Sequence, residues 1–196
     1  ILPDAYNRQN SKYNSGHSMI RYFNATQLPL AGKAFCEAEK LVSRHLRISD
    51  EQWKKNKYDV KTLAYLEQHE IKEGAFAHIC KYSYEKQDDA AGKTINTFDF
   101  YKICLQDNII LDAVERANSF VKLSPLMLYI AVHELIHVLR FASGEIVFEA
   151  SVEQKEQEEA LVHNLTKIAL QPAQDHDLDI ILDCFSSSFK IRDLYN

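Results

Sequence analysis

The chain has 196 residues, of which 46% are hydrophobic and 26% charged, values that are ordinary for one folded soluble domain. It contains only five Gly and four Pro, which excludes collagen-like and disordered classes and favours a helix-rich fold. The net charge of −5 gives no excess of basic residues that would attract phosphate groups, so nucleic acid is not an expected partner. Eight histidines are the one unusual group in this composition.

The first half of the chain predicts an arm followed by helices. Residues 1–30 are rich in Asn, Gln, Ser and Tyr without a clear period, which predicts an N-terminal arm laid over the body. Apolar residues recur at helical spacing over 33–47. Ser49 with Gln52 three residues later resembles a capping box and predicts a short helix. A longer helix is expected over 59–84, with Asp59 as its cap.

The second half predicts a strand and then two long helices. Alternating β-formers over 94–105 predict a strand. The Ser-Pro pair at 124–125 is a typical helix start, and the helix it predicts, over 126–141, is apolar on nearly every side. A turn at Gly144 leads to another helix over 149–170, which Pro172 ends.

These elements predict an α+β fold that is predominantly α, with a small sheet. We expect one domain over 31–172, with the tail 173–196 packed on it and forming one more helix. The longest apolar stretch, 126–139, contains two His and one Glu, which would be costly near the middle of a bilayer. It therefore predicts a buried helix rather than a membrane span.

The cysteines are far apart in the sequence. No Cys-x-x-Cys pair occurs, so neither a thiolate zinc site nor a redox motif is indicated. A chain of this size does not need disulfides, and a reduced cytoplasmic protein is the default expectation. Secretion stays open, because the sequence begins at Ile1 and the native N-terminus is not visible. The four cysteines are Cys36, Cys80, Cys104 and Cys184.

The chemistry lies in an HExxH motif within the central apolar helix, at 133–137. Residues four apart share a helix face, so His133 and His137 can bind one metal ion. Zinc held by two imidazoles and a third ligand keeps one position open, where water loses a proton near neutral pH. Glu134 follows the first ligand and can take that proton. We therefore predict Zn2+ as cofactor, His133 and His137 as ligands, and Glu134 as general base.

The position of this motif makes a chance occurrence unlikely. Chance alone predicts about 0.02 occurrences in a chain of this composition. Burying two imidazoles and a carboxylate costs several kcal/mol unless a partner satisfies them, and one metal ion satisfies all three. The alternative is a core helix whose histidines bond to backbone carbonyls.

The motif and the uncharged residues around it, 130–132 and 138–139, resemble the active-site helix of the zincin metallopeptidases. The extended metzincin motif requires Gly at 140 and His at 143, where this chain has Arg140 and Ser143. The resemblance is therefore to the gluzincin branch, which takes a Glu from a second, downstream helix. It also implies that a strand before the active-site helix offers a sheet edge to an extended substrate, and 94–105 is the candidate.

The gluzincin resemblance implies that the third ligand is a Glu of the helix predicted over 149–170. The candidates are Glu156, Glu158 and Glu159. Glu159 and His163 give ExxxH where thermolysin-like enzymes show ExxxD. A similar segment of ImmA/IrrE-type peptidases ends in an apolar pair near a proline, as 169–172 does here. We choose Glu159.

Two other assignments stay open for this ligand. Glu158 lies in line with the apolar residues of its helix and points more squarely at the apolar side. His163 could also be the third ligand, with Glu159 orienting it. The oxyanion-stabilising residue is not assigned; Tyr129 and His176 are possibilities without positive evidence.

Two rival functions come from other classes. Glu70 and Glu73 would share an apolar face of the helix predicted over 59–84, and together with the Glu-x-x-His unit at 134–137 they suggest a di-iron carboxylate bundle with oxidase or oxygenase activity. A salt-bridged or solvated helix face is the simpler interpretation of these two glutamates. The second rival is a non-catalytic zincin-like module with a regulatory or binding role.

We therefore expect a zinc-dependent metallopeptidase, a hydrolase that cleaves peptide bonds. The expected partner is a polypeptide substrate, with neither nucleic acid nor a membrane involved. Substrate specificity and oligomeric state do not follow from the sequence.

Overall fold

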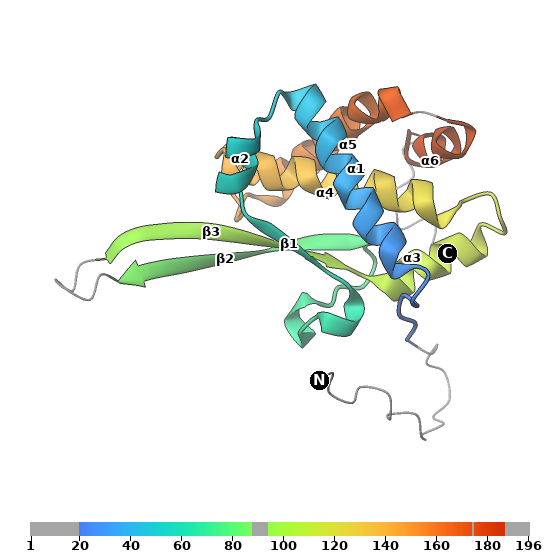
Figure 1. Cartoon of the computed structure of the whole chain (residues 1–196), viewed down its shortest axis with the longest axis horizontal. Helices are drawn as coiled ribbons and strands as arrows, with labels where there is room; N and C mark the ends of the chain where they lie inside the picture. The colour runs from blue at the N-terminus through green and yellow to red at the C-terminus, as the bar shows by residue number, and fades with distance from the viewer. Residues whose placement is uncertain (1–19, 88–93, 174, 187–196) are drawn as a thin grey trace, which may run out of the picture.

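The computed structural model describes residues 20–87, 94–173 and 175–186, which form the coloured part of Figure 1. Helices and a small mixed sheet make up this part, so the expected α+β class with predominant helix is confirmed. The helices are α1 (Leu28–Leu46), α2 (Asp50–Lys55), α3 (Asp107–Arg116), α4 (Leu123–Ala142), α5 (Val152–Leu170) and α6 (His176–Ser186), with 3-10 turns η1 (Leu63–Tyr65), η2 (Gln68–Glu70) and η3 (Gln171–Ala173). The strands are β1 (Tyr58–Lys61), β2 (Ala77–Gln87) and β3 (Thr94–Leu105).

The sheet has the strand order β1-β3-β2. β1 runs parallel to β3, while β2 runs antiparallel to it and pairs over almost its whole length. Figure 1 shows β2 and β3 as a long hairpin that extends beyond the helices, with α1, α4 and α5 on one side of the sheet and the η1–η2 segment on the other. Within the strand expected to offer a sheet edge, 94–105, the part 101–104 lies between β1 and β2 and has no free edge. Among the described residues, the edge strands of the sheet are β1 and β2.

Helix α4 is the centre of the core. It is apolar on almost every side because α1, α5, α6 and the sheet pack around it. Its length and composition would also suit a membrane span, but 67% of its most apolar stretch is buried inside the fold. The expectation of a buried helix is confirmed.

The helix predicted over 59–84 is wrong. This segment instead contains β1, the two 3-10 turns and the first part of β2. Gly74 interrupts it with a positive φ of 76°. The residues after it alternate between the two faces of the sheet, with Ile79 packed against the core and Tyr82 bonded to Glu70 on the other side. Glu70 therefore lies in η2, and Glu73 in the exposed loop that follows it, rather than both on one helix face. The di-iron alternative loses the helix on which it depended.

Other boundaries differ by a few residues. Most of the predicted arm, residues 1–19, lies outside the described residues, and α1 begins at Leu28, inside the predicted 1–30. The strand over 94–105 and the capping box of Ser49 and Gln52 are confirmed. Helix α4 begins at Leu123 after Lys122, without a side-chain cap, so the Ser124 cap is wrong. The sequence did not predict α3, and a helix in the tail is confirmed for α6.

Candidate metal centre

The two histidines of the HExxH motif face each other on α4. They are one turn apart, and the Nε2 atoms of His133 and His137 lie 3.1 Å from each other. His137 is buried and His133 is partly buried, so both rings are held by the packing around α4 rather than by solvent. Tyr129 stacks on His133 and Phe141 stacks on His137, each one turn away on the same helix.

Helix α5 brings Glu159 to the same point. Its Oε2 lies 3.4 Å from His133 Nε2, and its Oε1 lies 3.3 Å from His137 Nε2. The three donors form a group within 4.8 Å that could hold a metal ion. A tetrahedral zinc with ligands at about 2.0–2.1 Å places two of them ~3.4 Å apart, which matches these separations. The structure thus brings together the three ligands that the sequence analysis chose.

Both imidazole rings present their Nε2 atoms, rather than their Nδ1 atoms, to the carboxylate of Glu159. The Nδ1 atoms of His133 and His137 are buried and have no hydrogen-bond partner among the described residues. Each ring therefore offers only Nε2 to a polar partner, and the two Nε2 atoms point at one carboxylate. A metal ion between them would accept all three donors at once, which a single proton cannot do.

Glu134 is buried beside this group and lines the same cleft. Burial raises the pKa of Glu134 to about 7, and the charge of Glu159 adds to this rise, while His133 opposes it. A carboxyl with a pKa near neutrality can both accept and release a proton at neutral pH. At Glu159, desolvation would raise the pKa, but the hydrogen bonds with His133 and His137 outweigh it and hold the pKa well below its usual range.

Glu158, the first alternative ligand, has a different partner. Its side chain is 6% exposed and forms a two-pronged ion pair with Arg140 of α4, at 2.6 Å to Nε and 3.0 Å to Nη2. The prediction that it points at the apolar side of its helix is confirmed, but it is not in the group that could hold a metal. Its Oε1 lies 4.0 Å from the Nδ1 of His137. The ion pair fixes α5 against α4 next to Glu159.

His163, the second alternative ligand, also lies outside that group. Its Nδ1 is 2.7 Å from the hydroxyl of Tyr129, whose ring stacks on Phe185 of α6 at 4.4 Å. Burial lowers the pKa of His163 and raises that of Tyr129. His163 therefore packs beside the candidate metal centre, where it contacts Tyr129 and lines the same cleft.

A cleft of about 830 Å³ opens onto the three donors. One wall is the start of β2, residues 76–79, and the other walls come from α4, α5 and the loop between them. The backbone N–H of Gln106 donates to the carbonyl of Phe76. In an antiparallel ladder the backbone groups of successive residues point alternately toward and away from the partner strand. The N–H and C=O groups of Ala77 and Ile79 therefore point away from β3. Within the described part of the chain these backbone groups have no strand partner, so they form a strand edge beside the cleft.

Sequence reasoning missed two features of this site. The first is Arg140, and an inward-pointing Glu158 was the signal that could have revealed it, because a buried carboxylate needs a cation. The second is the β2 edge, which was hidden inside a segment predicted as helix. The aromatic side chains that line the cleft come from four separate segments, which no local pattern connects: Phe76, Tyr129, Phe141, Phe148 and Phe185.

Comparison with known proteins adds no relative: no family model matches the chain, and no curated protein or solved structure matches it significantly.

Proposed function

We propose that this protein is a zinc metallopeptidase of the zincin type, with a gluzincin-like ligand set. One observation carries the proposal: the Nε2 atoms of His133 and His137 and the carboxylate of Glu159 converge at 3.1–3.4 Å, at the base of a cleft and beside the buried Glu134. A purely structural ion would need neither an open cleft nor a carboxyl with a near-neutral pKa next to it.

In this proposal His133, His137 and Glu159 hold the ion. Zinc bound there would supply a Lewis acid that polarises the substrate carbonyl and lowers the pKa of water. Glu134 takes a proton from the attacking water and delivers it to the leaving amine. Arg140 and Glu158 keep α5 in register with α4, so that the carboxylate of Glu159 stays opposite the two imidazoles.

The proposed substrate is an extended polypeptide. Its backbone would pair with the free edge of β2 at Ala77 and Ile79, which lines the cleft. The aromatic lining supports a preference for an apolar side chain next to the cleaved bond. Pairing with a strand edge selects for unfolded chains, because a folded protein does not present such a backbone.

The test is a substitution that removes the base and keeps the ligands. Glu134→Gln should retain zinc, measured by elemental analysis, and lower the cleavage of an unfolded polypeptide by about 10²-fold or more, the usual contribution of a general base. Glu156→Gln, an exposed change on α5, is the control and should cleave as the wild type does. Unchanged hydrolysis in Glu134→Gln would overturn the proposal, as would iron in place of zinc in the purified protein.

A further inference from the structure

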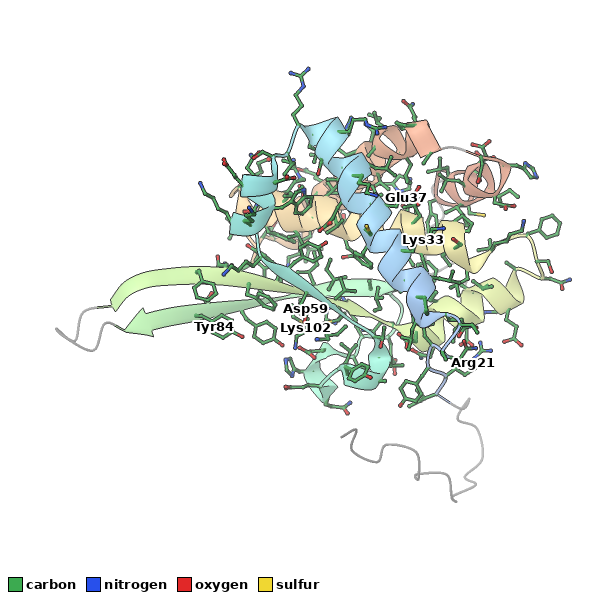
Figure 2. The ribbon with its side chains drawn as sticks, viewed as in Figure 1. Arg21, Lys33, Glu37, Asp59, Tyr84 and Lys102 are labelled. Carbon is green, nitrogen blue, oxygen red and sulfur yellow. The ribbon has the colours of Figure 1, made fainter. Side chains whose placement is uncertain are left out.

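A second cluster of metal-binding side chains lies on the sheet face opposite α4. Residues alternate along β3, so Ile103 is buried in the core and Tyr101 stacks on Phe141 of α4, while Lys102 and Cys104 face the other way. Figure 2 shows Lys102 on that side, toward the η1–η2 segment. His78 and Cys80 of β2 share this face with them.

The spacing of the three side chains suits one ion. The Sγ atoms of Cys80 and Cys104 are 3.9 Å apart, and the Nδ1 of His78 is 3.9 Å from the Sγ of Cys80. All three donor atoms lie within 4.8 Å of one another. A tetrahedral zinc with Zn–S of about 2.3 Å and Zn–N of about 2.0–2.1 Å separates two sulfurs by ~3.8 Å and a sulfur from a nitrogen by ~3.6 Å.

The hydrogen bond that His78 makes through Nε2 leaves its Nδ1 free to bind a metal ion. Its Nε2 lies 2.7 Å from the carbonyl oxygen of Glu70. A carbonyl can only accept, so this Nε2 carries the proton, and Nδ1, which faces Cys80, keeps its lone pair. The same carbonyl also accepts from the Nε2 of Gln106 at 3.0 Å, which fixes its position. Metal-binding imidazoles typically donate their other ring N–H to such an acceptor, which fixes the orientation of the ring.

The strand register argues against a simple disulfide. Cys80 lies opposite Lys102, and Cys104 lies opposite His78, so the two cysteines are diagonal neighbours. Diagonal Cα atoms in an antiparallel pair are about 7–8 Å apart, beyond the 4.4–6.8 Å usual for a disulfide. An ion bridges such a gap, because two metal–sulfur bonds then separate the cysteine side chains of the two strands.

The local charge also permits a divalent ion. Glu70 is 0% exposed and its carboxylate already pairs with Lys102 at 2.5 Å, so neither adds net charge at the cluster. Two thiolates and a neutral imidazole would then neutralise a 2+ ion completely. Cys104 is buried, whereas His78 and Cys80 are only partly buried, so water can reach a fourth position.

We propose that His78, Cys80 and Cys104 form a second metal site, which binds zinc independently of the centre between α4 and α5. On binding, the two thiols release their protons to solvent, and water completes the coordination. Soft thiolate ligands with one imidazole favour zinc over magnesium or calcium. The ion would join β2 to β3 at the base of the hairpin and, through His78, to the η2 turn.

Cobalt substitution tests this site separately from the first one, because only thiolate ligands give a sulfur-to-cobalt charge-transfer absorption in the near ultraviolet. The reduced full chain, stripped with a chelator, should bind two Co2+ or Zn2+ ions and show this absorption. The double variant His133→Ala and His137→Ala should bind one ion and keep the absorption. Cys80→Ala should bind one ion and lose it, with at least a tenfold drop in affinity at the second site.

Two controls keep the test decisive. Cys36→Ser and Cys184→Ser change exposed thiols outside the cluster and should leave the absorption intact. Cys80 is partly exposed, so its replacement leaves a smaller cavity than replacement of the buried Cys104, and circular dichroism checks the fold. A wild-type chain without the absorption, an absorption that persists in Cys80→Ala, or a Cys80–Cys104 disulfide that survives excess dithiothreitol would each overturn the proposal.

Discussion

Two neighbouring glutamates at the candidate metal centre have different partners because they point in different directions from α5. Consecutive residues on an α-helix point about 100° apart. Glu158 therefore faces α4 and pairs with Arg140, while Glu159 faces the two imidazoles and has a side chain that is 63% exposed. Glu158 holds α5 against α4 through its ion pair, and Glu159 is the candidate ligand.

Removing each glutamate should therefore have a different consequence. Glu159→Ala should lower zinc affinity at this centre by at least tenfold, with little effect on the free energy of unfolding of the metal-free protein. Glu158→Ala leaves the partly buried Arg140 with Glu145 as its remaining ion-pair partner and should cost about 1–3 kcal/mol of stability. Equilibrium zinc competition and urea unfolding measure the two effects. A loss of zinc only in Glu158→Ala would show that the ligand assignment is wrong.

Glu70 shows how a buried charge is satisfied away from the candidate metal centre. Burial alone would raise its pKa, but hydrogen bonds from Lys102 and Tyr82 outweigh burial and lower the pKa of Glu70 to about 2. The simpler of the two interpretations, a salt bridge, therefore holds for Glu70, although the helix on which it was placed does not exist.

This pKa predicts an acid-dependent stability. A carboxyl with a lowered pKa stabilises the fold above its unfolded pKa, about 4.3, and loses that contribution as the pH falls toward 2. The free energy of unfolding should therefore fall by about 3 kcal/mol between pH 5 and pH 2 because of Glu70. In Glu70→Gln this part of the pH dependence should disappear, whereas the exposed Glu73→Gln should keep it. Identical pH profiles for the two variants would contradict the assignment.

At the scale of elements, the turn between α4 and α5 depends on one glycine. Gly144 follows the end of α4 with a φ of 72°, and its amide donates to the carbonyl of Phe141. The chain can therefore reverse directly after the HExxH helix, and α5 returns alongside α4. This return is what places Glu159 near His137.

Two glycine substitutions should change stability in opposite directions. Gly144→Ala meets no atom within 4 Å, so its cost is the left-handed backbone alone, about 1–2 kcal/mol. Gly32→Ala lies in the middle of α1, also without a contact within 4 Å, and should stabilise the protein by about 0.5–1 kcal/mol. Chemical denaturation of both variants measures the difference. A stabilising Gly144→Ala would show that this turn does not need a glycine.

At the scale of the whole molecule, the proposed ion would join two helices of the helical layer. α4 lies in the core, while Glu159 comes from α5, so a bound ion crosses the interface between these helices. Anything that binds only the native state stabilises it by mass action. The cleft also lies where the helical layer meets the start of β2, so the substrate edge and the metal ligands come from different layers.

Metal removal should therefore lower the thermal stability of the molecule. Zinc at 100 times its dissociation constant adds about 2.7 kcal/mol, which raises Tm by several degrees for a domain of this size. Chelation should reverse the rise in the wild type, as followed by scanning calorimetry. The His133→Ala variant should lose the part of the rise that belongs to this centre. A Tm in His133→Ala that responds to zinc as the wild type does would contradict the site.

The sequence alone determined the features that depend on local spacing. Two histidines four apart share a helix face in any α-helix, and the surrounding apolar residues require that helix to be buried. Capping chemistry likewise placed the start of α2, and the alternation over 94–105 placed β3. Each of these follows from interactions between residues close in the chain.

Only the tertiary structure decided which distant residues meet. Glu158 and Glu159 are equally good ligands by type, and the packing of α5 against α4 selects which one faces His133 and His137. The segment 59–84 has helical spacing, but pairing with β3 makes its second part a strand, because long-range hydrogen bonds outweigh a weak local preference. The same pairing brings Cys80 to Cys104, which the sequence separates and no spacing rule connects.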